Sequence, residues 1–372
     1  MRTIFERDKS YDVVRKENGT VFSWHYSECI EEYETRSCML SLIITAYNQG
    51  KYIKTCLQSI ADNHNCTIDD FEIIVVNDGS TDNTHDVIND FLSESNQCIT
   101  YIRQENQGPG SARNIGIKYA RGNYIWIIDG DDMIANNSIE NILYACASGA
   151  DIIRIGLIFW KSESENYYAP INRDSWVLEN PLSYLTFKKE YFAPHQNLIF
   201  KHDLIMKDSI LYPIWIKQNE DYLFIVRLLM SANTIYANGT FQAYMFRMNV
   251  PVSLSRGPYD FERLNCDIQD KFAVLHELTE MLSCGEYEEN RLHALETYIA
   301  EYILQIIKTP IARRKSATLA LYTRYRLDKV YSSFIRKKLL FRMICNPFVY
   351  LCLYIVYPVI YPFYLMVKGK VR

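Results

Sequence analysis

Four short apolar runs alternate with helix-like segments between residues 39 and 129, and this alternation most constrains the fold. The runs are rich in β-branched and aromatic residues and have the length of buried strands. They comprise residues 39–45, 71–77, 98–104 and 123–129. The helix-like segments comprise residues 52–60, 82–94 and 108–120. Because parallel strands need a crossover connection, the sequence predicts an α/β fold with a mostly parallel sheet and helices on both faces.

The loops that follow the four runs are polar and contain most of the glycines of this region. They comprise residues 46–48, 77–79, 104–111 and 129–132. In open α/β sheets, ligands bind along the edge where the carboxyl ends of the parallel strands meet. We therefore expect these loops to form one functional site.

The loop after the last run contains three carboxylates, from Asp129, Asp131 and Asp132. Gly130 gives this turn a residue with a free φ angle. Like charges so close together repel one another unless a cation lies among them, and carboxylate oxygens suit Mg²⁺ or Mn²⁺. The alternative is a loop with aspartates at turn and N-cap positions, and the tetrapeptide alone does not decide between the two.

The composition is that of a folded protein, with 48% hydrophobic and 23% charged residues among 372. The ten cysteines form no CxxC pair or zinc-like spacing, and the N-terminus has no signal-peptide core, so we expect a cytoplasmic protein. The net charge of −4 conceals an asymmetry. From Lys308 onward there are 14 Lys or Arg residues and one acid, Asp328. The acidic body before Lys308 gives no reason to expect a nucleic-acid partner.

Beyond residue 150 the pattern predicts a strand at 151–160, followed by a hairpin. Two further strands, at 234–237 and 240–248, are expected to join through an Asn238-Gly239 turn. Residues 261–307 have helical periodicity with a break at Gly285.

Several motifs, taken in order, resemble family 2 glycosyltransferases of the GT-A fold. They are SLIITAYNQGKYIKTCLQSI, EIIVVNDGSTDNT, QENQGPGSARNIGIKYARGNYIWIIDGDD and NEDYLF. The resemblance covers residues 39–255 and implies a Rossmann-like GT-A domain at 39–258. An N-terminal extension (1–38), a helical region (259–310) and a basic, aromatic tail (311–372) would complete the chain.

The resemblance also implies roles for individual residues, with a nucleotide-sugar, usually a UDP-sugar, lying across the strand ends. Asp221 matches the general base, and Asp131 matches the ligand of the divalent metal (Mn²⁺ or Mg²⁺) that bridges the diphosphate. The residues implied to bind substrate are Ala46, Tyr47, Asn48, Asp78, Arg113, Asp129, Glu220 and Arg247. Of these, Ala46, Tyr47 and Asn48 would pack on the nucleotide base, and Asp78 would accept a hydrogen bond from it. The family more often has proline at the position of Thr45. Arg247 with Ser253 and Ser255 resembles an element near the donor diphosphate, but the histidine that often accompanies this element is missing.

The chemistry of sugar transfer explains these residue types. Cleavage of a glycosyl–phosphate bond places negative charge on the departing diphosphate, which a cation held by Asp131 would stabilise. The acceptor hydroxyl needs a base, here Asp221, on the opposite face of the sugar. Two carboxylates on opposite sides suit a single displacement with inversion. As alternatives, Glu220 and Asp221 would only cap a helix, and Arg113 would be a surface helix residue. His195 would either face the acceptor or, as is more common for a lone histidine, be structural.

The leading hypothesis is an inverting transferase of EC class 2.4 that moves a sugar to a glycan or lipid-linked acceptor in cell-surface polysaccharide synthesis. One alternative is a nucleotidyltransferase of related fold, which would need a Gly-rich basic loop after the first strand. The other is a sugar-nucleotide-binding assembly protein without catalysis. Release of UDP from a nucleotide-sugar in the presence of Mn²⁺ discriminates among them.

The basic tail suggests a location at an anionic membrane surface. Residues 343–367 carry no charge and are flanked by Lys and Arg. Five tyrosines at steps of four and three form one aromatic face, and Pro358 and Pro362 interrupt the helix in which they lie. We therefore expect a segment that lies in the interface, which makes the protein peripheral or monotopic at the inner face of the cell membrane. The alternative is that this face packs on the protein itself or on a second subunit of a homo-oligomer.

Overall fold

The computed structural model describes residues 11–17, 20–26, 38–63, 70–95, 99–162, 165–168, 177–186, 195–248, 250, 261–284 and 286–313. The chain divides into two compact units, Met1–Cys266 and Asp267–Arg372. The first unit contains a 12-stranded mixed sheet, and all four polar loops named above belong to it.

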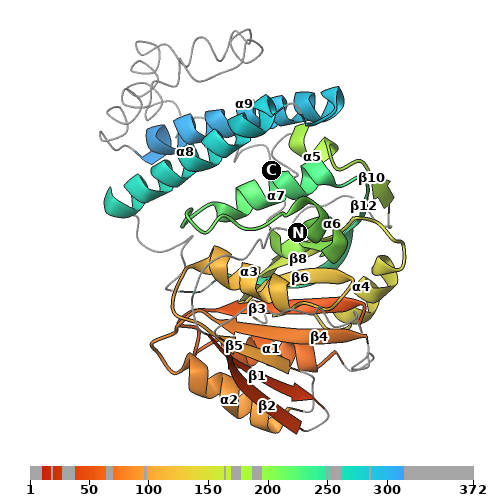
Figure 1. Ribbon diagram of the computed structural model, residues 1–372, viewed down its shortest axis with the longest axis vertical. Helices are drawn as coiled ribbons and strands as arrows, with labels where there is room; N and C mark the ends of the chain where they lie inside the picture. Colours follow the sequence, from red (N-terminus) through yellow and green to blue (C-terminus); the bar gives the residue numbers. More distant parts are fainter. Residues whose placement is uncertain are drawn as a thin grey trace. The chain divides into compact units, whose positions relative to one another are not determined.

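The centre of the sheet is parallel, in the order β6-β3-β4-β5 (Figure 1). These strands are β3 (Leu40–Ala46), β4 (Phe71–Asn77), β5 (Ile99–Arg103) and β6 (Tyr124–Asp129). Every residue of β3 and β4 is buried, which explains why these runs are apolar throughout rather than alternating. The predicted strands and their parallel pairing are confirmed.

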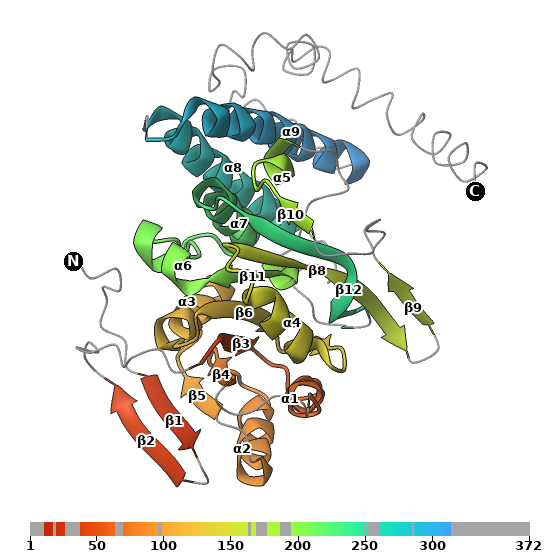
Figure 2. The same ribbon diagram turned by 90° about the vertical axis from the view of Figure 1, so that its right-hand side faces the viewer.

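Helices cover both faces of this parallel centre (Figure 2). Apolar side chains of α1 (Ile53–Ala61), α2 (Thr84–Glu94) and α4 (Ser138–Cys146) share one core with Leu42 and Ile44 of β3. On the other face lies α3 (Pro109–Tyr119). A Cβ added to Gly116 of α3 would lie 2.2 Å from Cγ2 of Ile43, so the helix packs very closely on β3. This close approach brings the N-terminus of α3 to the carboxyl edge of the sheet.

A two-stranded extension widens the sheet at the β5 edge (Figure 2). It consists of β1 (Tyr11–Glu17) and β2 (Thr20–Tyr26), which pair antiparallel, and β1 also pairs antiparallel with β5. The weak periodicity of residues 1–38 did not predict these strands. Their pairing explains how a polar segment is held, since the edge of β5 supplies the backbone partners.

The other half of the sheet continues beyond β6 as β11-β8-β12-β10, with β7 and β9 as side branches. These strands are β7 (Met133–Ile134), β8 (Ile152–Ser162), β9 (Glu165–Tyr168), β10 (Val177–Glu179), β11 (Leu198–Lys201) and β12 (Ile235–Arg247). The short helical elements among them are α5 (Ser183–Thr186), the 3₁₀ turn η1 (His195–Asn197) and α6 (His202–Asp208). The antiparallel β8–β9 pair is the hairpin expected after residue 160.

The predicted Asn238-Gly239 hairpin is wrong. Residues 235–247 form the single strand β12, which stays parallel to β8 on both sides of an irregularity between Ala237 and Tyr244. The side chain of Asn238 accepts a hydrogen bond from the Phe241 amide over 3.0 Å, which closes the extra residues into a bulge. The Asn-Gly pair thus marks a bulge rather than a hairpin turn, and the chain continues in the same direction.

Three longer helices complete the described chain: α7 (Glu220–Ser231), α8 (Phe261–Ser283) and α9 (Glu289–Arg313). Phe224 of α7 packs edge-to-face on Phe200 of β11, on the face of the sheet that α3 covers. The helical period after residue 261 and its break near Gly285 are confirmed, and α9 continues past Pro310. No helix among the described residues has the length and apolar character needed to cross a bilayer. The predicted interfacial segment at 343–367 lies outside the described residues.

Candidate active site

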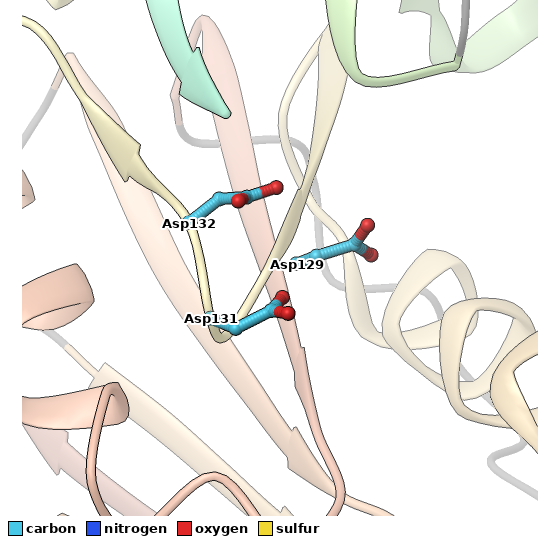
Figure 3. Close-up of side chains that lie close together, drawn as sticks. All are labelled: Asp129, Asp131 and Asp132. Carbon is cyan, nitrogen blue, oxygen red and sulfur yellow. The ribbon is translucent and has the colours of Figure 1, made fainter. Parts of the chain in front are cut away.

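The turn between β6 and β7 places three aspartates together at the carboxyl edge of the sheet. One carboxylate oxygen each from Asp129, Asp131 and Asp132 lies within 4.8 Å of the others, and the side chains project to the same side of the turn (Figure 3). The turn requires glycine at position 130 for a different reason from the predicted free φ angle. Its φ is not positive, but a Cβ there would lie 2.9 Å from the carbonyl oxygen of Thr45. The turn therefore needs glycine because β3 passes so close.

Asp132 is the buried member of this cluster and is tied to β12. Its Oδ2 accepts a hydrogen bond from the Tyr244 hydroxyl over 2.6 Å, and its Oδ1 accepts from the Arg247 amide over 2.7 Å. The same hydroxyl accepts from the amide of Asp129 over 3.2 Å. Burial, together with Asp131 and Asp129, raises the pKa of Asp132 well above its usual range. Asp132 and Tyr244 thus fix the shape of the turn.

Asp129 accepts hydrogen bonds from one cationic and one amide donor. Its Oδ1 accepts from Arg113 over 3.2 Å, and its Oδ2 accepts from Gln196 over 2.7 Å. Burial alone would raise the pKa of Asp129, but Arg113, His195 and Gln196 outweigh burial and hold that pKa well below its usual range. Asp129 is therefore a carboxylate held in its charged form.

The cluster has the ligand chemistry of a divalent cation site. Its carboxylate oxygens are hard ligands, as Mg²⁺ and Mn²⁺ prefer, and they lie within the span of one ion's coordination shell. The prediction that Asp131 is the metal ligand is compatible with this geometry.

Glu220 and Asp221 begin α7 opposite the aspartate cluster. The preceding Asn219 adopts a left-handed conformation (φ 69°), which turns the chain into the helix. Glu220 is buried and accepts a hydrogen bond from Arg113 Nη1 over 2.5 Å. Burial raises the pKa of Glu220 above its usual value, although Arg113 opposes this shift. Asp221 keeps 23% of its side chain exposed, so it is the member of the pair that a substrate can reach.

Arg113 links the two sets of carboxylates. Its guanidinium donates to Glu220 through Nη1 and to Asp129 through Nη2, and it lies over the Tyr212 ring at 5.2 Å. Burial alone would lower the pKa of Arg113, but Asp129 and Glu220 raise it, so the side chain stays charged. The interpretation of Arg113 as a surface helix residue is therefore excluded, since only 7% of its side chain is exposed.

The first two loops of the sheet edge are fastened to each other. The Asn48 amide donates to Ser80 Oγ over 3.0 Å, its side-chain oxygen accepts from the Thr81 amide over 2.8 Å, and Asn48 has a positive φ of 54°. Ala46 is buried, whereas Tyr47 is 44% exposed. Of the predicted base-contacting residues, Tyr47 thus offers the aromatic surface.

Asp78 is buried and organises the loop before α3. Its Oδ1 accepts from the Gln104 side chain over 2.7 Å and from the Gln107 amide over 2.9 Å, and its Oδ2 accepts from the Gly108 amide over 2.9 Å. The carboxylate that the resemblance assigns to the nucleotide base is therefore also the anchor of residues 104–108.

Arg247 approaches the aspartate turn from β12. Its Nε donates to the carbonyl oxygen of Asp131 over 2.8 Å, and its guanidinium lies over the rings of Trp160 at 4.7 Å and Tyr52 at 5.1 Å. Stacking between two rings holds a guanidinium in one plane. Ser253 and Ser255, which the sequence groups with Arg247, lie outside the described residues.

The sequence motifs include the aspartate cluster, Arg113 and Asp221, but not several residues that hydrogen-bond to them. Tyr244 and Gln196 contact the aspartates from β12 and η1, and nothing in their local sequence marks them. His195, interpreted as structural, has its ring nitrogens 3.9 Å from Asp129 Oδ1 and 3.9 Å from Asp221 Oδ2. Only the fold of β11 against β6 brings η1 to this position.

Residues 41–208 match the family described as glycosyl transferase family 2. This part of the chain is similar to that family. It is 30% identical over 227 residues to glycosyltransferase GlyA of Streptococcus pneumoniae serotype 4, covering 58% of this chain and 31% of that protein. It is 26% identical over 195 residues to the poly(ribitol-phosphate) beta-N-acetylglucosaminyltransferase TarS of Staphylococcus aureus, covering 52% of this chain and 33% of TarS. The chain thus spans about a third of the length of these family 2 relatives.

The fold of the chain is that of a solved structure. The crystal structure of S. aureus TarS 1-349 superposes with a TM-score of 0.65 at 19% identity, over 86% of this chain and 91% of that one. The expected GT-A fold, with its sheet and following helices, is confirmed.

Proposed function

We propose that this protein is an inverting, metal-dependent glycosyltransferase that moves a sugar from a UDP-sugar to a glycan or lipid-linked acceptor in cell-surface polysaccharide synthesis. The observation that carries the proposal is the pairing of two carboxylate sets across one site. The aspartates of the β6–β7 turn lie on one side, Glu220 and Asp221 lie on the other, and Arg113 contacts both sets.

The cation supplies Lewis-acid stabilisation of the departing diphosphate when it is bound. In this proposal Asp131 holds the cation, and Asp129, fixed by Arg113 and Gln196, orients the nucleotide end of the donor. The exposed ring of Tyr47 packs on the base. Arg247, whose guanidinium lies over the rings of Tyr52 and Trp160, directs positive charge toward the diphosphate.

Asp221 takes the proton from the attacking acceptor hydroxyl as the new glycosidic bond forms. The hydroxyl is a poor nucleophile unless a base removes this proton in the transition state. Because the base and the diphosphate lie on opposite sides of the sugar, a single displacement inverts the anomeric centre. Asp221 suits the role better than Glu220, whose Oε1 is engaged by Arg113 inside the protein.

The relatives support the donor and acceptor classes. TarS has been crystallised with UDP and with UDP-GlcNAc, and its name gives poly(ribitol-phosphate) as its acceptor. UDP-GlcNAc is therefore the first donor to test here. The experiment is UDP release from a panel of UDP-sugars with Mn²⁺, followed by determination of the anomeric configuration of the product. A retained anomeric configuration would contradict the single displacement.

A further inference from the structure

His195 lies between the two sides of the site and belongs to neither of the motifs that define it. It begins η1, directly before β11, and the residue is 2% exposed. Its Nδ1 is 3.9 Å from Asp221 Oδ2, and its Nε2 is 3.9 Å from Asp129 Oδ1. The imidazole thus spans the distance between the carboxylate assigned to the acceptor side and the one assigned to the donor side.

The ring is held in this position by its neighbours. Its edge packs on the Tyr212 ring, with centroids 5.9 Å apart, and Tyr212 in turn stacks on Phe224 of α7 at 3.9 Å. The following residue, Gln196, is fixed at both ends. Its carbonyl oxygen accepts from the Trp126 indole over 2.8 Å, and its side chain donates to Asp129. The position of the imidazole is therefore built into the fold.

Neither ring nitrogen of His195 has a hydrogen-bond partner within the described part of the chain. Buried polar groups are normally paired, because an unpaired one loses its hydration without compensation. Both nitrogens instead face a carboxylate at a distance slightly longer than a hydrogen bond. Catalytic hydrogen bonds are often long in a protein without its substrate and shorten when the substrate binds. A purely structural histidine would be expected to have partners outside the site.

We propose that His195 is a positioning residue for Asp221. Its Nδ1 side holds the Asp221 carboxylate in the orientation that meets the acceptor hydroxyl, while its Nε2 side keeps the ring aligned against Asp129. This inference rests on the proposed function, because it assigns a support to the base of that reaction. It requires no proton transfer through the ring.

Three substitutions of His195 distinguish the contact that Nδ1 makes with Asp221 from the contact that Nε2 makes with Asp129. The amide of asparagine can occupy the place of Nδ1, and the longer side chain of glutamine can place its amide where Nε2 lies. His195→Asn therefore keeps the contact toward Asp221, His195→Gln keeps the contact toward Asp129, and His195→Ala keeps neither. Each variant is assayed for kcat of transfer, for KM of the acceptor, and for UDP affinity in the presence of Mn²⁺.

The proposal predicts that His195→Ala lowers kcat on the order of 10²-fold, as expected for a misplaced catalytic group, with UDP affinity nearly unchanged. His195→Asn should recover most of this loss, and His195→Gln should recover little. Equal kcat in all four proteins would overturn the proposal, as would recovery by glutamine and not by asparagine. A parallel loss of UDP affinity and kcat in every variant would assign His195 a structural role and would also overturn it.

A second measurement leaves His195 in place, so it applies even if the His195 variants are unstable. In protein labelled with ¹⁵N-histidine, Asp221→Asn should change the Nδ1 resonance of His195, and an unchanged resonance would overturn the proposal. Failure of the proposed function can be distinguished from failure of this inference, because the unmutated protein would then release no UDP from any donor. Failure of this inference leaves the unmutated protein active.

Discussion

Arg113 donates from Nη1 to Glu220 Oε1 over 2.5 Å and so joins α3 to the first turn of α7. Both side chains are buried, with 7% and 8% of their surfaces exposed. The contact brings a residue of α3 together with one more than a hundred positions later in the chain.

Removal of Arg113 should therefore destabilise the fold. Arg113→Met leaves the buried Glu220 carboxylate beside an apolar side chain, and breaking a buried pair in this way typically costs about 3–5 kcal/mol. The free energy of unfolding from urea denaturation measures this effect. Lys54→Ala is the matched control, because it breaks the exposed ion pair with Glu94 and should cost less than about 1 kcal/mol. Equal costs for the two variants would contradict the assignment of Arg113 to a buried network.

The two acids that begin α7 should differ in function. Asp221→Asn should lower the transfer rate by about 10²–10⁴-fold, because general-base catalysis is lost. Its affinity for UDP should barely change. Glu220→Gln is the matched variant and should lower stability more than catalysis, since it weakens the contact with Arg113. If Asp221→Asn kept near-full transfer and Glu220→Gln did not, the two roles would be exchanged.

The aspartate cluster should make UDP binding metal-dependent. Asp131→Asn removes one charge from the cation site, so UDP affinity in the presence of Mn²⁺ should fall while the melting temperature stays close to that of the unmutated protein. Calorimetric titration of both proteins, with and without EDTA, measures this difference. Identical UDP affinity of the unmutated protein with Mn²⁺ and with EDTA would refute the metal role.

The basic tail should bind anionic membranes. From Lys308 onward the chain carries 14 Lys or Arg residues, and each basic charge near an anionic surface contributes about 1 kcal/mol. Full-length protein should sediment with phosphatidylserine vesicles at low salt, and a variant ending before Arg336 should remain in the supernatant while it still releases UDP. If the full-length protein did not sediment with the vesicles, the result would support packing of the tail on the protein itself or on a second subunit.

The sequence predicted the parallel half of the sheet and the edge that holds the site, because buried parallel strands and their polar loops leave a local signal. The antiparallel half was harder to predict. The bulge in β12 resembled a hairpin, since an Asn-Gly pair suits both structures and only pairing with β8 distinguishes them. The extension β1–β2 depends on the edge of β5 rather than on its own pattern.

The same limit applies to the site. Asp129, Asp131 and Asp221 lie in motifs with a recognisable local sequence. Tyr244 and Gln196 act through contacts with residues 112 and 67 positions away, and no spacing rule predicts such contacts. Gly130 was correctly singled out, but the constraint comes from the backbone of β3 rather than from a special dihedral angle.

The most direct test of the account is UDP release from UDP-GlcNAc and other UDP-sugars by the unmutated protein, with Mn²⁺ and with EDTA, beside Asp131→Asn and Asp221→Asn. The account predicts turnover of at least one donor by the unmutated protein with Mn²⁺. It also predicts loss of turnover with EDTA and in Asp131→Asn, and a strong reduction of transfer in Asp221→Asn. Binding of UDP with no turnover of any donor in the panel would contradict the account and favour a sugar-nucleotide-binding assembly protein.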